Sequence, residues 1–267
     1  MFYRFLFFIS LGWNFLATAC LAEKPIVIIV PSFNNIRWVE RNLLSLINQE
    51  YTNYRIIYID DCSEDGTYEQ VLQILNQYSS LVKTEIKKNS IRQGALKNIY
   101  EAVCCCEDDE IIVTVDGDDG LARKDVLKII NEVYSSKDEV WLTHGSYVTT
   151  KGVKGISTEI PKNVIQNHSF RKHAQPSHLR TFYTWLFKKI KLEDLQYKGE
   201  FFPVSWDVAM MIPMLEMASE RHAYIPHLLY IYNDQNPIND HRINAEKQLD
   251  LYKHIKLKKP YPRLESR

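Results

Sequence analysis

Short apolar runs alternate with amphipathic segments over the first half of the chain. Residues 26–30 form a continuous run of β-branched side chains, which is typical of a strand that is buried on both faces. In residues 36–49 the apolar positions recur three and four residues apart, which predicts a helix. The alternation continues, with strands expected at 55–59, 83–87 and 111–115 and helices at 67–76, 95–105 and 124–134.

The alternation weakens after about residue 140. We expect a strand at 140–142, helices at about 179–190 and 208–218, and a late strand at 224–232 before a polar stretch. The chain has no linker rich in proline, glycine or serine and no internal repeat. The pattern therefore predicts one continuous domain over residues 23–245, with halves at 23–135 and 136–245.

Strand–helix repetition at this spacing predicts an α/β fold with a mostly parallel central sheet flanked by helices. Ligands of such sheets bind beyond the carboxyl ends of the strands. Six chemically notable side chains follow three of the predicted strands at those ends, namely Phe33, Asp60, Asp61, Asp116, Asp118 and Asp119. We expect them to share one rim of the sheet.

The acidic segment Asp116-Gly117-Asp118-Asp119 directly follows an apolar strand. Carboxylates are poorly tolerated in a core, so these side chains are expected to lie just past the strand and to face a cleft. Oxygen ligands of this kind suit a hard divalent cation that is shared with substrate phosphates. A solvated acidic turn is the alternative that this segment leaves open when it is taken alone.

Composition and charge narrow the class of protein. The 267 residues carry 33 Lys and Arg against 33 Asp and Glu, so no net field attracts nucleic acid. Residues 5–22 are almost wholly apolar, and 1–22 are predicted to be a signal peptide or a membrane anchor rather than a buried helix. We therefore expect membrane association, with a secreted or cytoplasmic protein as the alternative. Residues 246–267 are locally basic and predict a solvated tail.

Three motifs in series resemble the family 2 glycosyltransferases, which have the GT-A fold. They are Pro31-Ser32-Phe33-Asn34, Asp60-Asp61-Cys62-Ser63-Glu64-Asp65-Gly66-Thr67 and Asp116-Gly117-Asp118-Asp119. Their order and spacing both match, and the resemblance covers roughly residues 25–135. It implies a nucleotide-binding half at 23–135 and an acceptor half at 136–245.

The resemblance also implies roles for single residues. Phe33 would stack on the nucleotide base, Asp61 would accept a hydrogen bond from it, and Asp118 would bind Mg²⁺ or Mn²⁺ at the diphosphate. His241 is the candidate for a late histidine that completes the metal shell. The expected nucleotide-binding set is Pro31, Ser32, Phe33, Asp60, Asp61, Arg92, Asp116, Gly117 and Arg180.

Asp207 is the candidate catalytic base. In the family an acidic residue before a helix deprotonates the acceptor hydroxyl, often within a Glu-Asp or Thr-Asp pair. Here the pair is Trp206-Asp207, which departs from that pattern. A helix N-cap is the structural alternative for this aspartate, and the two roles are compatible.

The expected function is an inverting, metal-dependent glycosyltransferase that moves a sugar from a nucleotide-diphospho-sugar to a hydroxyl of a glycan, lipid or protein. A non-catalytic sugar-nucleotide-binding protein on the same fold is the alternative. A calcium-binding loop is excluded by spacing, because Leu121 and Leu127 occupy the positions that need glycine and a bidentate glutamate.

Overall fold

The computed structural model describes residues 21–136 and 139–267. The predicted signal peptide or anchor at 1–22 lies almost entirely outside the described residues. Within them, no helix has both the length and the apolar character to cross a membrane.

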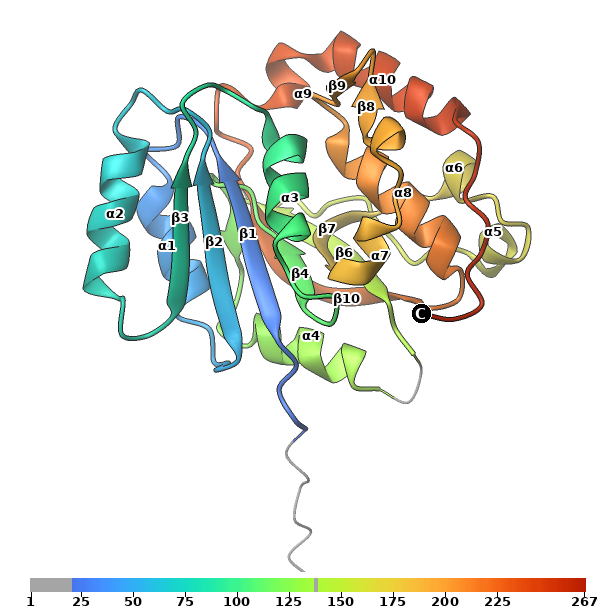
Figure 1. The fold of residues 1–267 in the computed structure, drawn as a ribbon, viewed down its shortest axis with the longest axis horizontal. Helices are drawn as coiled ribbons and strands as arrows, with labels where there is room; N and C mark the ends of the chain where they lie inside the picture. The colour runs from blue at the N-terminus through green and yellow to red at the C-terminus, as the bar shows by residue number, and fades with distance from the viewer. Residues whose placement is uncertain (1–20, 137–138) are drawn as a thin grey trace, which may run out of the picture.

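A central sheet of eight strands carries the fold (Figure 1). Its order is β3-β2-β1-β4-β7-β6-β10-β5, and a separate hairpin pairs β8 with β9. The strands are β1 (Ile26–Ser32), β2 (Tyr54–Asp60), β3 (Lys83–Lys88), β4 (Ile111–Thr114), β5 (Gly120–Leu121), β6 (Leu142–Thr149), β7 (Ser177–Tyr183), β8 (Gln196–Tyr197), β9 (Glu200–Phe201) and β10 (His222–Tyr232). Strands β3, β2, β1 and β4 are parallel neighbours, as are β6 and β10. Strand β7 is antiparallel to both β4 and β6, and β5 is antiparallel to β10.

Helices cover both faces of this sheet (Figure 1). They are α1 (Val39–Ile47), α2 (Thr67–Gln77), α3 (Ala95–Cys104), α4 (Val126–Tyr134), α5 (Lys162–Gln166), α6 (Phe170–His173), α7 (Thr184–Lys188), α8 (Trp206–Ala218), α9 (Asp240–Ile243) and α10 (Ala245–Leu257), with a short 3-10 helix η1 (Leu192–Leu195). The mostly parallel α/β architecture predicted from the alternation is confirmed.

Alternate residues of β1 enter two separate cores. Val27 and Ile29 pack in the cluster that includes α3 and α8, whereas Ile28 and Val30 pack in the cluster that includes α1, α2 and α4. Successive side chains of a strand point to opposite faces, so a strand covered on both sides needs an unbroken apolar run. This explains why residues 26–30 show no polar alternation.

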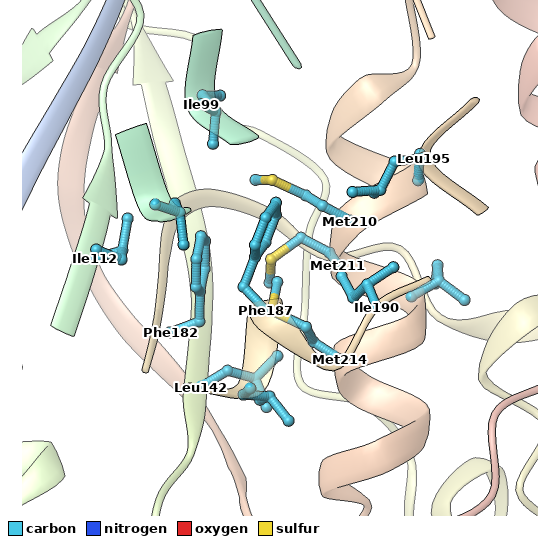
Figure 2. Packing of buried hydrophobic residues seen from close by; sticks show 14 of the residues in the cluster. Ile99, Ile112, Leu142, Phe182, Phe187, Ile190, Leu195, Met210, Met211 and Met214 are labelled. Atoms are coloured by element: carbon cyan, nitrogen blue, oxygen red, sulfur yellow. The ribbon is translucent and has the colours of Figure 1, made fainter. Parts of the chain in front are cut away.

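Helix α8 is apolar all round because the fold surrounds it. Met210, Met211 and Met214 are fully buried, and Figure 2 shows their thioethers around Phe187. Phe187 stacks on Phe182 of β7 with ring centroids 5.5 Å apart, which links α7 to the sheet. Flexible methionines fill the irregular space that two aromatic rings leave.

The helix predicted at 179–190 is wrong in its first half. Residues 177–183 form β7, which lies antiparallel between β4 and β6, and only Thr184–Lys188 are helical. All but the ends of β7 are buried, so its apolar positions give no period of two. Its β-branched and aromatic residues Thr181, Phe182 and Tyr183 are typical of strands.

The solvated tail predicted at 246–267 is also wrong. Residues 245–257 form α10, and Leu251, Ile255 and Tyr261 are buried against the core cluster that contains α8. A buried ion pair supports this packing: Arg171 donates to the Glu216 carboxylate and to the Ile255 carbonyl. The C-terminal segment is therefore a docked helix and not a solvated tail.

Replacing Phe187 by alanine is expected to lower the free energy of unfolding by about 3–5 kcal/mol, because it opens a cavity between the sheet and α8. Leu81→Ala is the matched control, since Leu81 is 63% exposed. Equilibrium urea unfolding measures both variants. Equal stability of the two variants would contradict the packing role of Phe187.

Candidate functional site

A cavity of about 260 Å³ opens at the carboxyl ends of β1 and β4. It brings together residues from both halves of the chain, including Pro31, Phe33, Arg92, Asp116, Gly117, Asp118, Asp119, His178, Arg180, Trp206, Asp207 and Asn236. Strand β7 is the reason that the second half reaches this rim. Because β7 runs antiparallel to β4, with Arg180 opposite Thr114, the start of β7 lies beside the end of β4.

The acidic loop that follows β4 is held against β1 and α1. A Cβ atom on Gly117 would lie 2.4 Å from the Ser32 hydroxyl oxygen, so only glycine allows this approach. Fully buried Asn42 of α1 donates through Nδ2 to the carbonyls of Asp116 and Asp119, at 3.1 and 3.0 Å. Arg41 donates to the Asp118 carbonyl at 2.7 Å.

The carboxylates of this loop are bound by the segment around the end of β10. The Tyr230 hydroxyl donates to Asp119 at 2.6 Å and accepts from the Asp116 amide at 3.1 Å. The backbone amide of Asn233 donates to the other carboxylate oxygen of Asp119 at 2.6 Å. Asn236 donates to Asp118 at 2.7 Å. These hydrogen bonds hold the acidic loop in one conformation, so it is not a solvated turn.

Negative charge accumulates in this loop. Burial raises the pKa of Asp118. Burial, followed by repulsion from Asp118 and Asp116, raises the pKa of Asp119 well above its ordinary value. A raised carboxylate pKa means that the ionised form lacks compensation from the protein. A bound cation would supply that compensation.

Asp116, Asp119 and His178 form the group best placed to hold such a cation, since one ligand atom from each lies within 4.8 Å of the others. Burial lowers the pKa of His178 well below its ordinary value, so the imidazole is neutral. Its Nε2 accepts from Arg180 at 2.9 Å, because a guanidinium can only donate. With Nε2 taken by Arg180, the proton of the neutral imidazole lies on Nδ1, so the ligand atoms for a cation come from Asp116 and Asp119. Two carboxylates fit a divalent cation such as Mn²⁺ or Mg²⁺.

An aromatic and a basic side chain form the wall of the cavity on the β1 side. The guanidinium of Arg92 lies over the Phe33 ring, 3.9 Å from its centroid. Behind them, the Asp61 carboxylate accepts from the backbone amides of Gln93 and Gly94, each at 2.8 Å. Burial by itself would raise the pKa of Asp61, but hydrogen bonds from Asn98, Gln93 and other donors lower it overall.

A buried cation lies on the opposite wall. Arg180 is 3% exposed, and its Nε and Nη1 have no hydrogen-bond partner among the residues that the structure describes. Its Nη2 lies 3.5 Å from Asp207, and its guanidinium lies 5.1 Å from the Trp206 ring centroid. Free N–H donors on a desolvated guanidinium make a strong site for a phosphate or carboxylate.

Asp207 lies in the first turn of α8 and is partly exposed, with a side-chain exposure of 29%. The residue at the N-cap position is Ser205, so Asp207 does not have the N-cap role that sequence leaves open. Ser205 donates to the Gln248 carbonyl of α10, which fixes the start of α8. The Asp207 carboxylate is therefore held at the cavity by Arg180 and remains open to it.

Three of the predicted nucleotide-binding residues do not line the cavity. The Ser32 hydroxyl accepts from Tyr58 at 2.8 Å, and fully buried Asp60 accepts from the Ser63 amide at 3.1 Å. Asp61 lies behind the Arg92 loop. Their contacts are those of residues that shape the loops, and direct contact with a nucleotide stays a prediction. The side chain of His241 lies outside those that the structure describes.

The supporting residues of the acidic loop were not singled out from sequence. Asn42 lies on a helix predicted from apolar spacing, and Tyr230 lies on a strand predicted the same way. His178 directly precedes the segment that was predicted to be a helix. The available signal in the sequence is polar residues next to apolar ones. Asn42 directly precedes Leu43 of the apolar helix face, and the mostly polar residues 233–239 directly follow an apolar strand.

The chain is similar to known sugar-transferring proteins. A model of the family described as glycosyl transferase family 2 matches residues 27–196. The chain is 28% identical to the poly(ribitol-phosphate) β-N-acetylglucosaminyltransferase TarP of Staphylococcus aureus over 152 residues. These residues make up 56% of this chain and 43% of TarP. The chain thus spans less than half the length of that relative.

Solved structures share the fold. TarS 1–349 of Staphylococcus aureus, in complex with UDP-GlcNAc, has a TM-score of 0.62 at 18% identity, over 86% of this chain and 65% of that one. The mannosyltransferase PcManGT of Pyrobaculum calidifontis, in complex with GDP-Man and Mn²⁺, has a TM-score of 0.59 at 18% identity, over 90% and 66%. The GT-A fold expected from the motifs is confirmed.

Asn42→Leu is expected to lower the free energy of unfolding by about 2 kcal/mol, because it leaves the Asp116 and Asp119 carbonyls without their side-chain donor. Asn76→Leu on the exposed face of α2 is the matched control. Urea unfolding of both variants provides the measurement. If Asn42→Leu is as stable as the control, the acidic loop does not depend on this asparagine.

Proposed function

The chain belongs to glycosyl transferase family 2, and on that premise we propose that it is an inverting, metal-dependent glycosyltransferase. It moves a sugar from a nucleotide-diphospho-sugar to an acceptor hydroxyl. One observation carries the proposal: a single cavity contains a buried, underpaired arginine, an acidic loop and a separate carboxylate at a helix start. These are the groups that a diphosphate, a cation and a nucleophile require.

The donor would lie along the floor of the cavity. Phe33, which has Arg92 over its ring, would stack on the base, while Asp61 holds the Gln93–Gly94 backbone in place. Arg180 would bind the diphosphate through its free N–H groups. The complex of TarS with UDP-GlcNAc supports a UDP-sugar as the first donor to test.

Asp207 would act as the base. Its carboxylate accepts the proton of the acceptor hydroxyl while the oxygen attacks the anomeric carbon from the face opposite the departing diphosphate. Attack from that face inverts the configuration at the anomeric carbon. The nearby Arg180, 3.5 Å from this carboxylate, orients it toward the cavity.

The divalent cation that the family implies, Mg²⁺ or Mn²⁺, would be held by Asp116 and Asp119 beside His178. When bound, it supplies positive charge that stabilises the departing nucleoside diphosphate. The Mn²⁺ in the PcManGT complex supports a divalent cation as part of the proposal. The sequence-based candidates Asp118 and His241 stay predictions.

Asp207→Asn is expected to lower the turnover number for sugar transfer by about 10²–10⁴-fold, because an amide cannot accept the hydroxyl proton. The donor dissociation constant should change little, since Asp207 makes no contact that the diphosphate requires. Asp250→Asn, on the exposed face of α10, is the matched control. Transfer that survives Asp207→Asn unchanged would favour a binding protein or a different base.

Asp119→Asn is expected to weaken Mn²⁺ binding by about tenfold or more, because it removes one of the clustered carboxylates. The free Mn²⁺ signal in electron paramagnetic resonance measures this directly, and Asp118→Asn provides the comparison. A greater loss in Asp118→Asn would assign the ligand role to Asp118. Donor hydrolysis should also cease with a chelator and return with Mn²⁺; activity that ignores the chelator contradicts metal dependence.

A further inference from the structure

A second cavity, of about 280 Å³, lies on the other side of Asp207. Ser205, Asp207 and Gln248 line both this cavity and the first one, so the carboxylate stands between them. The outer wall is α10, which contributes Leu249 and Tyr252. A base that faces two cavities can act between a donor bound in one cavity and an acceptor bound in the other.

The charge of the second cavity differs from that of the first. Among the residues that the structure describes, Asp207 is the only charged side chain in its lining, whereas Arg92 and Arg180 line the donor cavity. Lys256 contacts this wall: its ammonium lies over the Tyr252 ring, 5.1 Å from the centroid, and donates to the Ala174 carbonyl. Burial lowers the pKa of Lys256 to about 8.

The shape-forming groups of the second cavity are an aromatic ring, an amide and short apolar side chains. Tyr252 is half-buried, with its ring against the cavity. Burial, and then the nearby Asp207 carboxylate, raises the pKa of Tyr252, so its hydroxyl remains a donor. Aromatic faces with a few placed polar groups suit a neutral, hydroxylated ring better than a phosphate-bearing chain.

We propose that this second cavity is the acceptor subsite and that it takes a neutral pyranose ring of a glycoside. Tyr252 is its stacking surface, and the Gln248 amide is its hydrogen-bond partner. The inference rests on the proposed function, since Asp207 is the base for both. The acceptor oxygen bonds to the anomeric carbon, the bond from that carbon to the diphosphate oxygen breaks with its electrons leaving on the diphosphate, and the hydroxyl proton passes to Asp207.

The test uses the full chain with its donor and two kinds of acceptor probe. The first are methyl glycosides of glucose, galactose, mannose and N-acetylglucosamine; the second is ribitol 5-phosphate. We expect a glycoside to be the better acceptor, and Tyr252→Ala to raise its KM by about tenfold or more. Tyr252→Trp keeps an aromatic face and should stay within about threefold of the parent. Lys253→Ala, exposed on the same helix, is the matched control.

Melting temperature and donor dissociation constant, measured on every variant, separate loss of the subsite from loss of the fold. If Tyr252→Ala does not fold, Gln248→Leu takes its place, with the same expected rise in acceptor KM. The inference is overturned if ribitol 5-phosphate is the better acceptor, if no glycoside is used, or if Tyr252→Ala matches Lys253→Ala. Failure of the proposed function looks different: no donor is hydrolysed, or Asp207→Asn has no effect.

Discussion

Packing three carboxylates at the end of a fully buried strand is the constraint on which the site depends. Burial disfavours the ionised form of Asp118 and Asp119, and repulsion from the neighbouring carboxylates adds to this at Asp119, so the pKa values of both are raised. The protein meets it with directed donors rather than with a nearby lysine: Tyr230 and Asn236 bind the carboxylates, and Asn42 binds the loop carbonyls. The hydrogen bonds fix the loop without cancelling its charge, so a site for a cation persists.

These donors make the two halves of the chain one unit. Asn42 belongs to the first half, whereas Tyr230 and Asn236 come from more than a hundred residues later. The insertion of β7 beside β4 has the same effect, because it carries Arg180 from the second half to the rim built by the first. A folded acidic loop therefore requires both halves of the sheet to be in place.

Sequence predicted the part of the site that follows from strand ends. Phe33 and Asp116 lie on one rim because parallel strands end at one edge, and apolar runs mark those strands. Residues 177–183 gave no such signal, since His178, Arg180 and Thr181 interrupt the apolar run and the neighbour Thr184 begins a helix. Tyr230 could not be assigned to the site either, because its ring serves the core while only its hydroxyl reaches Asp119.

The arrangement also explains how Asp207, the proposed base, can lie near the proposed diphosphate site. A carboxylate near a diphosphate would repel it unless a cation stands between them, and Arg180 has that position: its Nη2 faces Asp207 while Nε and Nη1 remain open. In the proposed complex the same guanidinium would screen Asp207 from the donor. Because α10 lines the second cavity and Ser205 ties the start of α8 to α10, the C-terminal segment helps to set the position of Asp207.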